Sequence, residues 1–160
     1  MATTPTINTG SVVVDANVVI AICAREKDKL SKAETALKEY AARGRVFYAP
    51  GLIVGEVLYV LCGKLQNGTL TEVEHEKAVR SFQVQMNAIL PPPSGDAALI
   101  TKGEAIRKGY GCSRSADSVY LALAEELNQS GTTEIVTFDE GLQRQAMKNA
   151  VGVTIRLLTS

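Results

Sequence analysis

The sequence predicts an α/β fold, a single domain with a mainly parallel central sheet sandwiched between helices. The run Val12-Val13-Val14 is apolar and β-branched throughout, which is typical of a strand that helices cover on both faces. Along the rest of the chain, short apolar runs alternate with segments of helical periodicity. The chain has 160 residues, of which 46% are hydrophobic, and this is enough to bury one core.

The first half of the chain is expected to hold two strands and four helices. Residues 1–10 are polar and uncharged, and we expect a flexible tail there, followed by the domain at 11–160. Gly44 ends one predicted helix, and Thr71 with Glu74 forms a capping box at the start of another. The expected strands are 11–14 and 46–49, and the expected helices are 18–24, 29–43, 52–66 and one from the Thr71 cap to about 86. The helix at 52–66 is strongly apolar, and we expect most of its circumference to be buried.

The second half continues the alternation. The run Pro91-Pro92-Pro93 predicts a turn or rigid spacer that is too short to link two domains. The expected strands are 88–90, 134–137 and 153–158, and the expected helices are 96–108, 115–129 and 139–149. No internal repeat interrupts this order, so a single layered α/β domain is the predicted architecture.

The composition excludes several classes of protein. Seventeen basic residues balance seventeen acidic ones, so any nucleic-acid binding must come from a local patch. Cys23, Cys62 and Cys112 lie far apart and are expected to be reduced core residues, neither disulfide partners nor zinc ligands. The N-terminal segment lacks the features of a signal peptide, and no apolar stretch reaches the roughly 18–20 residues of a membrane span. We therefore expect a soluble cytoplasmic protein.

Four carboxylates stand at positions that suit a shared site. Asp15 and Asp139 follow predicted strands, and ligands of open parallel sheets bind beyond the carboxyl ends of the strands. Asp117 opens a predicted helix, and Glu56 interrupts the most apolar one. Each acid alone also has a structural explanation, because Asp117 and Asp139 would suit a helix N-terminus and Glu56 would suit a narrow solvent-exposed strip.

Taken together, the four acids predict a cation site. Two unit charges about 4 Å apart repel by about 4 kcal/mol at an effective dielectric constant of 20, so converging carboxylates need a cation or shared protons. Oxygen ligands favour Mg²⁺ or Mn²⁺. Zinc is not expected, because the only histidine, His75, lies between Glu74 and Glu76 on a helix face that should be solvated.

The motifs around these acids resemble those of PIN domains. The similarity extends from Val12 to Leu157 and therefore covers nearly the whole chain. PIN domains are metal-dependent nucleases, and many are the ribonuclease toxins of VapBC-type toxin–antitoxin pairs. The resemblance rests on four segments in order, Val-Val-Asp15-Ala-Asn17, Leu-Ile-Val-Gly-Glu56-Val-Leu, Ser-Ala-Asp117-Ser-Val-Tyr-Leu-Ala-Leu-Ala and Val-Thr137-Phe-Asp139.

The resemblance implies hydrolysis of phosphodiester bonds in single-stranded RNA, in which a divalent ion polarises the phosphoryl oxygen and lowers the pKa of a bound water. Arg114, three residues before Asp117, is the first candidate for a phosphate contact. Lys27, Lys29, Lys32, Arg107 and Lys108 are further candidates. An antitoxin protein and a second copy of the chain are the partners that follow from the resemblance. The implied catalytic and metal-binding residues are Asp15, Glu56, Asp117 and Asp139, with Asn17 and Thr137 as supporting polar groups.

Other functions stay open at the level of sequence. A catalytically silent PIN-like binding or scaffold module would usually have lost one or more of the acids, and a housekeeping PIN ribonuclease without an antitoxin would share every motif. A phosphotransferase of the haloacid-dehalogenase type would need a second acid where this chain has Asn17. A response-receiver domain would need adjacent acids after its first strand.

Overall fold

A parallel sheet is the centre of the molecule. The computed structural model describes residues 10–114, 116–149 and 151–159. Within these residues five strands form one sheet in the order β3-β2-β1-β4-β5, and every neighbouring pair is parallel. The strands are β1 (Ser11–Val14), β2 (Val46–Tyr48), β3 (Ile89–Leu90), β4 (Thr133–Thr137) and β5 (Thr154–Leu157).

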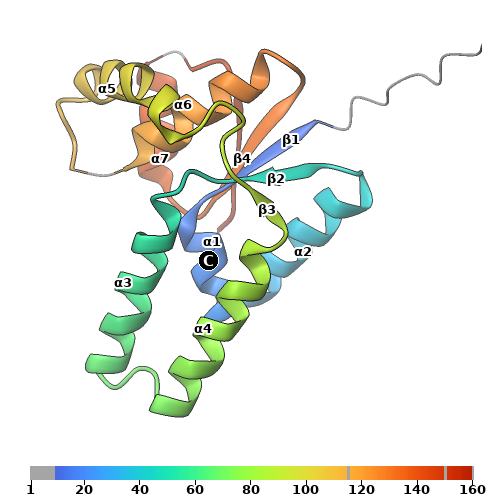
Figure 1. Ribbon diagram of the computed structural model, residues 1–160, viewed down its shortest axis with the longest axis vertical. Helices are drawn as coiled ribbons and strands as arrows, with labels where there is room; N and C mark the ends of the chain where they lie inside the picture. The colour runs from blue at the N-terminus through green and yellow to red at the C-terminus, as the bar shows by residue number, and fades with distance from the viewer. Residues whose placement is uncertain (1–9, 115, 150, 160) are drawn as a thin grey trace, which may run out of the picture.

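Helices cover both faces of the sheet (Figure 1). Val12 and Val14 pack into the core beneath the first four helices, and Val13 packs into the core beneath the later ones. All three valines have 0% exposure, which confirms the strand expected to be buried on both faces. The helices are α1 (Ala16–Cys23), α2 (Leu30–Ala42), α3 (Ile53–Gln66), α4 (Glu72–Met86), the 3-10 helix η1 (Asp96–Leu99), α5 (Ile100–Gly109), α6 (Asp117–Asn128) and α7 (Glu140–Lys148).

The predicted elements are found, with ends displaced by one or a few residues. The capping box of α4 is present, because the Glu74 amide donates to the Thr71 hydroxyl and the Thr71 amide donates to the Glu74 carboxylate. α1 begins two residues earlier than expected, which moves Asn17 into its first turn. The helix expected at 96–108 is divided into η1 and α5.

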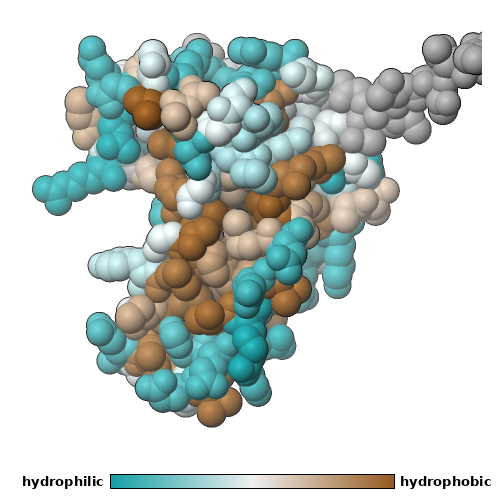
Figure 2. Space-filling model, in the orientation of Figure 1, coloured by the Kyte–Doolittle hydropathy of each residue, from teal (hydrophilic) through white to brown (hydrophobic). Residues whose placement is uncertain are grey.

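α3 differs most from the prediction. It was expected to be buried around most of its circumference, but only Ile53, Val57 and Leu61 are buried. Periodicity reports which side chains are apolar and not which neighbours cover them. Figure 2 shows the resulting hydrophobic band over the part of the surface where Figure 1 places α3. Its outward apolar residues are Val54, Leu58 and Tyr59, which are 43%, 41% and 82% exposed.

Three other expectations can be compared with the structure. Cys23 is buried, but Cys62 and Cys112 are exposed, so the expected core position is wrong for two of the three free thiols. The expected tail lies outside the described residues except for Gly10, which is buried and accepts a hydrogen bond from the Val46 amide. Every helix in the described ranges is too short or too polar to cross a membrane.

Candidate active site

The candidate site lies at the carboxyl edge of the two central strands. Asp15 directly follows β1, and Thr137 is the last residue of β4. Because β1 and β4 are parallel neighbours, both residues are brought to the same edge of the sheet. The Asp15 side chain is only 6% exposed and therefore needs polar partners.

Thr137 and Asn17 supply these partners. The Thr137 hydroxyl donates to Asp15 Oδ2 at 2.7 Å, and the Asn17 amide group donates to the same oxygen at 3.2 Å. Asn17 also donates to Thr137 Oγ1 at 3.2 Å and accepts from the Phe138 amide at 3.1 Å. The two residues expected to support the site are thus placed against its most buried acid.

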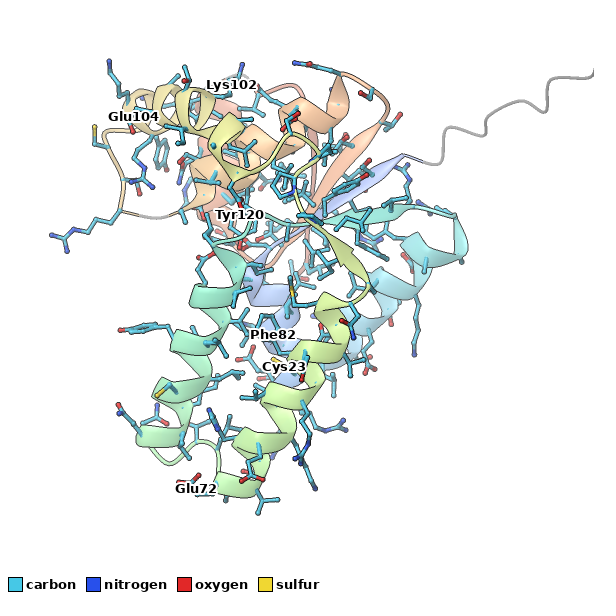
Figure 3. All side chains as sticks on the ribbon, viewed as in Figure 1. Cys23, Glu72, Phe82, Lys102, Glu104 and Tyr120 are labelled. Atoms are coloured by element: carbon cyan, nitrogen blue, oxygen red, sulfur yellow. The ribbon has the colours of Figure 1, made fainter. Side chains whose placement is uncertain are left out.

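Glu56 reaches the site from α3. Its carboxylate is half-buried and accepts a hydrogen bond of 2.6 Å from the hydroxyl of Tyr120 in α6. This hydrogen bond gives Glu56 the partner that burial of a carboxylate requires. Figure 3 shows Tyr120 at the level of the first turn of α3, between the two halves of the molecule.

Asp117 is the first residue of α6 and accepts a hydrogen bond of 2.9 Å from Gln145 Nε2 in α7. Gln145 is only 2% exposed, and it is one of few buried polar side chains in the described part of the chain. Neither Gln145 nor Tyr120 was singled out for the site from the sequence. Tyr120 lies three residues after Asp117, a spacing that places both on one helix face and could have indicated its position.

Asp139 is linked to Asp15 through Thr137, by way of its backbone amide. Its backbone amide donates to Thr137 Oγ1 at 2.9 Å, and its carboxylate accepts from the Gly141 amide at 2.7 Å as the N-cap of α7. The structural role considered for Asp139 is therefore present, whereas the place of its carboxylate in the metal site stays a prediction. Arg114 is exposed in the segment before α6, and its expected phosphate contact stays a prediction.

The acids interact electrostatically. Burial raises the pKa of Asp15 to about 7; the hydrogen bond from Thr137 opposes this rise, and the charges of Asp117 and Glu56 add to it. Burial also raises the pKa of Glu56, against the hydrogen bond from Tyr120. Burial, the charge of Asp15 and the hydrogen bond to Glu56 hold the pKa of Tyr120 far above its usual range, so this hydroxyl stays a neutral donor.

The acids of the site offer the kind of ligand atom that a hard divalent cation binds. These ligand atoms are carboxylate oxygens, and Asp15, Glu56 and Asp117 are close enough for their charges to interact. The described residues contain no group of three acid, histidine or cysteine side chains already gathered around one point. An ion would therefore have to draw the carboxylates closer or be completed by water ligands, as Mg²⁺ commonly is.

Comparisons with known proteins bear on the fold and the family of the chain. No curated protein sequence matches the chain. The fold is similar to that of VapBC2 from Rickettsia felis, solved bound to a DNA fragment from its promoter, with a TM-score of 0.58, 10% identity and coverage of 92% of this chain and 98% of that one. It is also similar to FitAcB from Neisseria gonorrhoeae, with a TM-score of 0.54, 17% identity and coverage of 90% and 95%.

These identities establish a shared fold, whereas the family follows from the sequence itself. The family model of the PIN domain matches residues 12–148, which include all four acids. The chain belongs to the PIN domain family, whose members are nucleases.

Proposed function

We propose that the protein is a Mg²⁺- or Mn²⁺-dependent endoribonuclease that hydrolyses single-stranded RNA. PIN-domain nucleases generally use divalent metal ions. The observation that carries the proposal is that Glu56 and Asp117, from two separate helices, lie close enough to Asp15 for their charges to act on it. Buried like charges destabilise a fold unless a cation or protons compensate them, so a structural role alone explains this cluster poorly.

Each residue has a role in the proposed reaction. Asp15, Glu56, Asp117 and Asp139 would hold the ion, which supplies Lewis acidity toward a phosphoryl oxygen and lowers the pKa of a water. Thr137 and Asn17 orient the Asp15 carboxylate through the hydrogen bonds that they donate. With its pKa near 7, Asp15 is protonated in about half of the metal-free molecules at neutral pH, and ion binding would release this proton.

The substrate strand would meet cations at the rim of the site. Lys29 Nζ lies 5.3 Å from the centroid of the Phe138 ring, and Phe138 stands between Thr137 and Asp139. This contact supports a position for Lys29 beside the acids, where a phosphate of the bound RNA would pass. Arg114 is the second proposed phosphate contact, because it precedes the acid that opens α6.

An antitoxin protein is the proposed partner, and the protein would then be the toxin of a toxin–antitoxin pair. The fold similarity to the VapBC2 complex supports this proposal. The motifs of the site are equally compatible with a PIN ribonuclease that has no antitoxin. Retention of all four acids disfavours a catalytically silent PIN-like module. The cytoplasmic location stays a prediction.

A homodimer through α3 is the second proposed assembly. The outward side of this helix carries no charged residue between Val54 and Gly63, because Glu56 turns toward Tyr120. An uncharged apolar surface pairs best with another such surface, and a two-fold axis through α3 would pair it with itself. We expect Leu58→Glu to convert a dimer into a monomer in light scattering, whereas Val84→Glu, on the exposed side of α4, should leave the dimer intact. A wild type that is monomeric at every concentration would contradict the homodimer.

RNA cleavage tests the proposed activity. Purified protein free of any partner would be incubated with labelled single-stranded RNA in EDTA, Mg²⁺ or Mn²⁺, beside Asp15→Asn and the control Asp28→Asn, which changes an exposed aspartate. We expect cleavage only with metal, its loss in Asp15→Asn and its retention in Asp28→Asn. Equal cleavage by wild type and Asp15→Asn would identify a contaminant, and failure of the wild type to bind Mn²⁺ would refute the metal site.

A further inference from the structure

Two buried polar residues that are not among the site residues expected from the sequence each donate to one acid of the site. Tyr120 is 1% exposed and its hydroxyl lies 2.6 Å from Glu56 Oε1. Gln145 is 2% exposed and its Nε2 lies 2.9 Å from Asp117 Oδ2. We propose that Tyr120 and Gln145 are positioning residues of the metal centre, which hold Glu56 and Asp117 in the orientations that receive the ion. This inference rests on the proposed metal-dependent function.

The hydrogen bond from Tyr120 restrains a side chain that would otherwise be free to turn. Glu56 lies in the first turn of α3 and is only half-buried, so its three rotatable bonds could carry the carboxylate into solvent. Tyr120 is rigid beyond its first two torsions and is enclosed by the core beneath α6. Its hydroxyl therefore supplies a fixed anchor, and the Glu56 carboxylate stays on the side of α3 that faces the sheet edge.

Gln145 acts in the same way between α7 and α6. Asp139 caps the start of α7, and Gln145 lies further along the same helix, so one rigid element carries an acid and the donor to another acid. α6 shows the complementary arrangement, because Asp117 and Tyr120 lie three residues apart on it. The two helices thereby fix Glu56, Asp117 and Asp139 relative to one another before an ion arrives.

A second tyrosine offers a matched control. Tyr40 is 0% exposed, and its hydroxyl donates to the Glu134 carboxylate at 2.5 Å. Glu134 is the second residue of β4 and so lies toward the amino end of the strand, away from the acids at the carboxyl end. Tyr40→Phe and Tyr120→Phe therefore remove the same group from the same kind of buried contact, and only the second contact belongs to the site.

The test measures Mn²⁺ affinity by calorimetry and stability by urea unfolding in EDTA. We expect Tyr120→Phe to weaken Mn²⁺ binding about 10–100-fold, the usual effect of losing a partner of a metal ligand. Tyr40→Phe should leave the Mn²⁺ affinity unchanged. It should lower the urea midpoint of unfolding by about as much as Tyr120→Phe does. Gln145→Leu, which keeps the volume and removes the donor, should weaken binding as Tyr120→Phe does.

The outcomes separate this inference from the function on which it rests. A wild type that does not bind Mn²⁺ would overturn the proposed metal site and this inference with it. Normal Mn²⁺ affinity in both Tyr120→Phe and Gln145→Leu, with binding by the wild type intact, would overturn only the positioning roles. If Tyr40→Phe weakened Mn²⁺ binding as much as Tyr120→Phe, the positioning roles would also be overturned, because the lost affinity would then follow from general destabilisation. If Tyr120→Phe fails to fold, Gln145→Leu alone decides the result by the same criterion.

Discussion

Asp15→Asn should make the metal-free protein more stable at neutral pH. The buried Asp15 carboxyl has a pKa of about 7 in the folded protein against an ordinary value of 3.8, so the fold disfavours its charge. Asparagine keeps an oxygen that can accept from Thr137 and Asn17, and it carries no charge to be repelled by Glu56 and Asp117. The substitution thus removes the electrostatic cost and keeps the contacts.

The magnitude follows from proton linkage. Because the folded pKa is the higher one, the stability that Asp15 contributes is fully present below pH 3.8 and is lost as the pH rises to about 7. This rise in the pKa of Asp15 corresponds to a loss of about 4 kcal/mol at most in the free energy of unfolding. The free energy of unfolding of Asp15→Asn should equal that of the wild type near pH 4. Its excess over the wild type should grow between pH 4 and 7 and stay constant above pH 7. Near pH 7.5 it corresponds to a rise in melting temperature of about 8–16 °C for a domain of this size.

Urea and thermal unfolding in EDTA at a series of pH values between 4 and 8 would measure the difference. Asp28→Asn is the control, because it removes an exposed carboxylate and should show no such pH-dependent gain. Added Mn²⁺ should stabilise the wild type at pH 7.5 and have far less effect on Asp15→Asn, since the variant lacks a ligand. A stability difference between Asp15→Asn and wild type that does not change from pH 4 to 7 would refute the assignment of a raised pKa to this carboxyl.

Three further results are expected. Because Asp15 holds a proton below about pH 7, the apparent Mn²⁺ affinity should fall about tenfold per pH unit below that value and level off above it, which calorimetry from pH 5.5 to 8.5 would measure. Thr137→Val removes a hydroxyl that donates to Asp15, so it should cost about 1–3 kcal/mol in urea unfolding and raise the pKa of Asp15 further. Asp139→Ala should lose both Mn²⁺ affinity and about 1 kcal/mol of stability because α7 loses its cap, whereas Asp139→Asn should keep the cap and lose only the affinity; equal stability of the two variants would contradict the capping role.

The sheet and its acids were predictable from local patterns. Val12-Val13-Val14 has a composition that only a strand covered on both faces explains well, and the abrupt change to Asp15 marks the end where such sheets bind ligands. The capping box at Thr71 and the stop at Gly44 depend on side chains or backbone freedom within a few residues. Signals of this kind are complete within a short window and do not depend on how distant elements pack.

The features that the sequence did not reveal depend on contacts between elements that are far apart along the chain. α3 has the composition of a buried helix, yet the sequence does not show that no element of the described chain covers Leu58 and Tyr59. Tyr120 belongs to the apolar face of α6, so its pattern indicates core, and its hydroxyl finds Glu56 only because α3 packs nearby, 64 positions away along the chain. Gln145 offers no local signal, since a glutamine in an exposed helix looks the same in sequence.

The side chains that donate hydrogen bonds to Asp15 and Glu56 also indicate what these two acids do. Thr137, Asn17 and Tyr120 are neutral donors, so they orient Asp15 and Glu56 without cancelling their negative charge. Lysine or arginine at the same places would stabilise the fold more directly, but its fixed positive charge would compete with a divalent ion for the carboxylates. Neutral donors reduce the cost of the buried charge only in part, and the remaining cost is visible in the raised pKa of Asp15. A site that keeps this cost in its metal-free state is therefore better suited to binding a cation than to stabilising the fold.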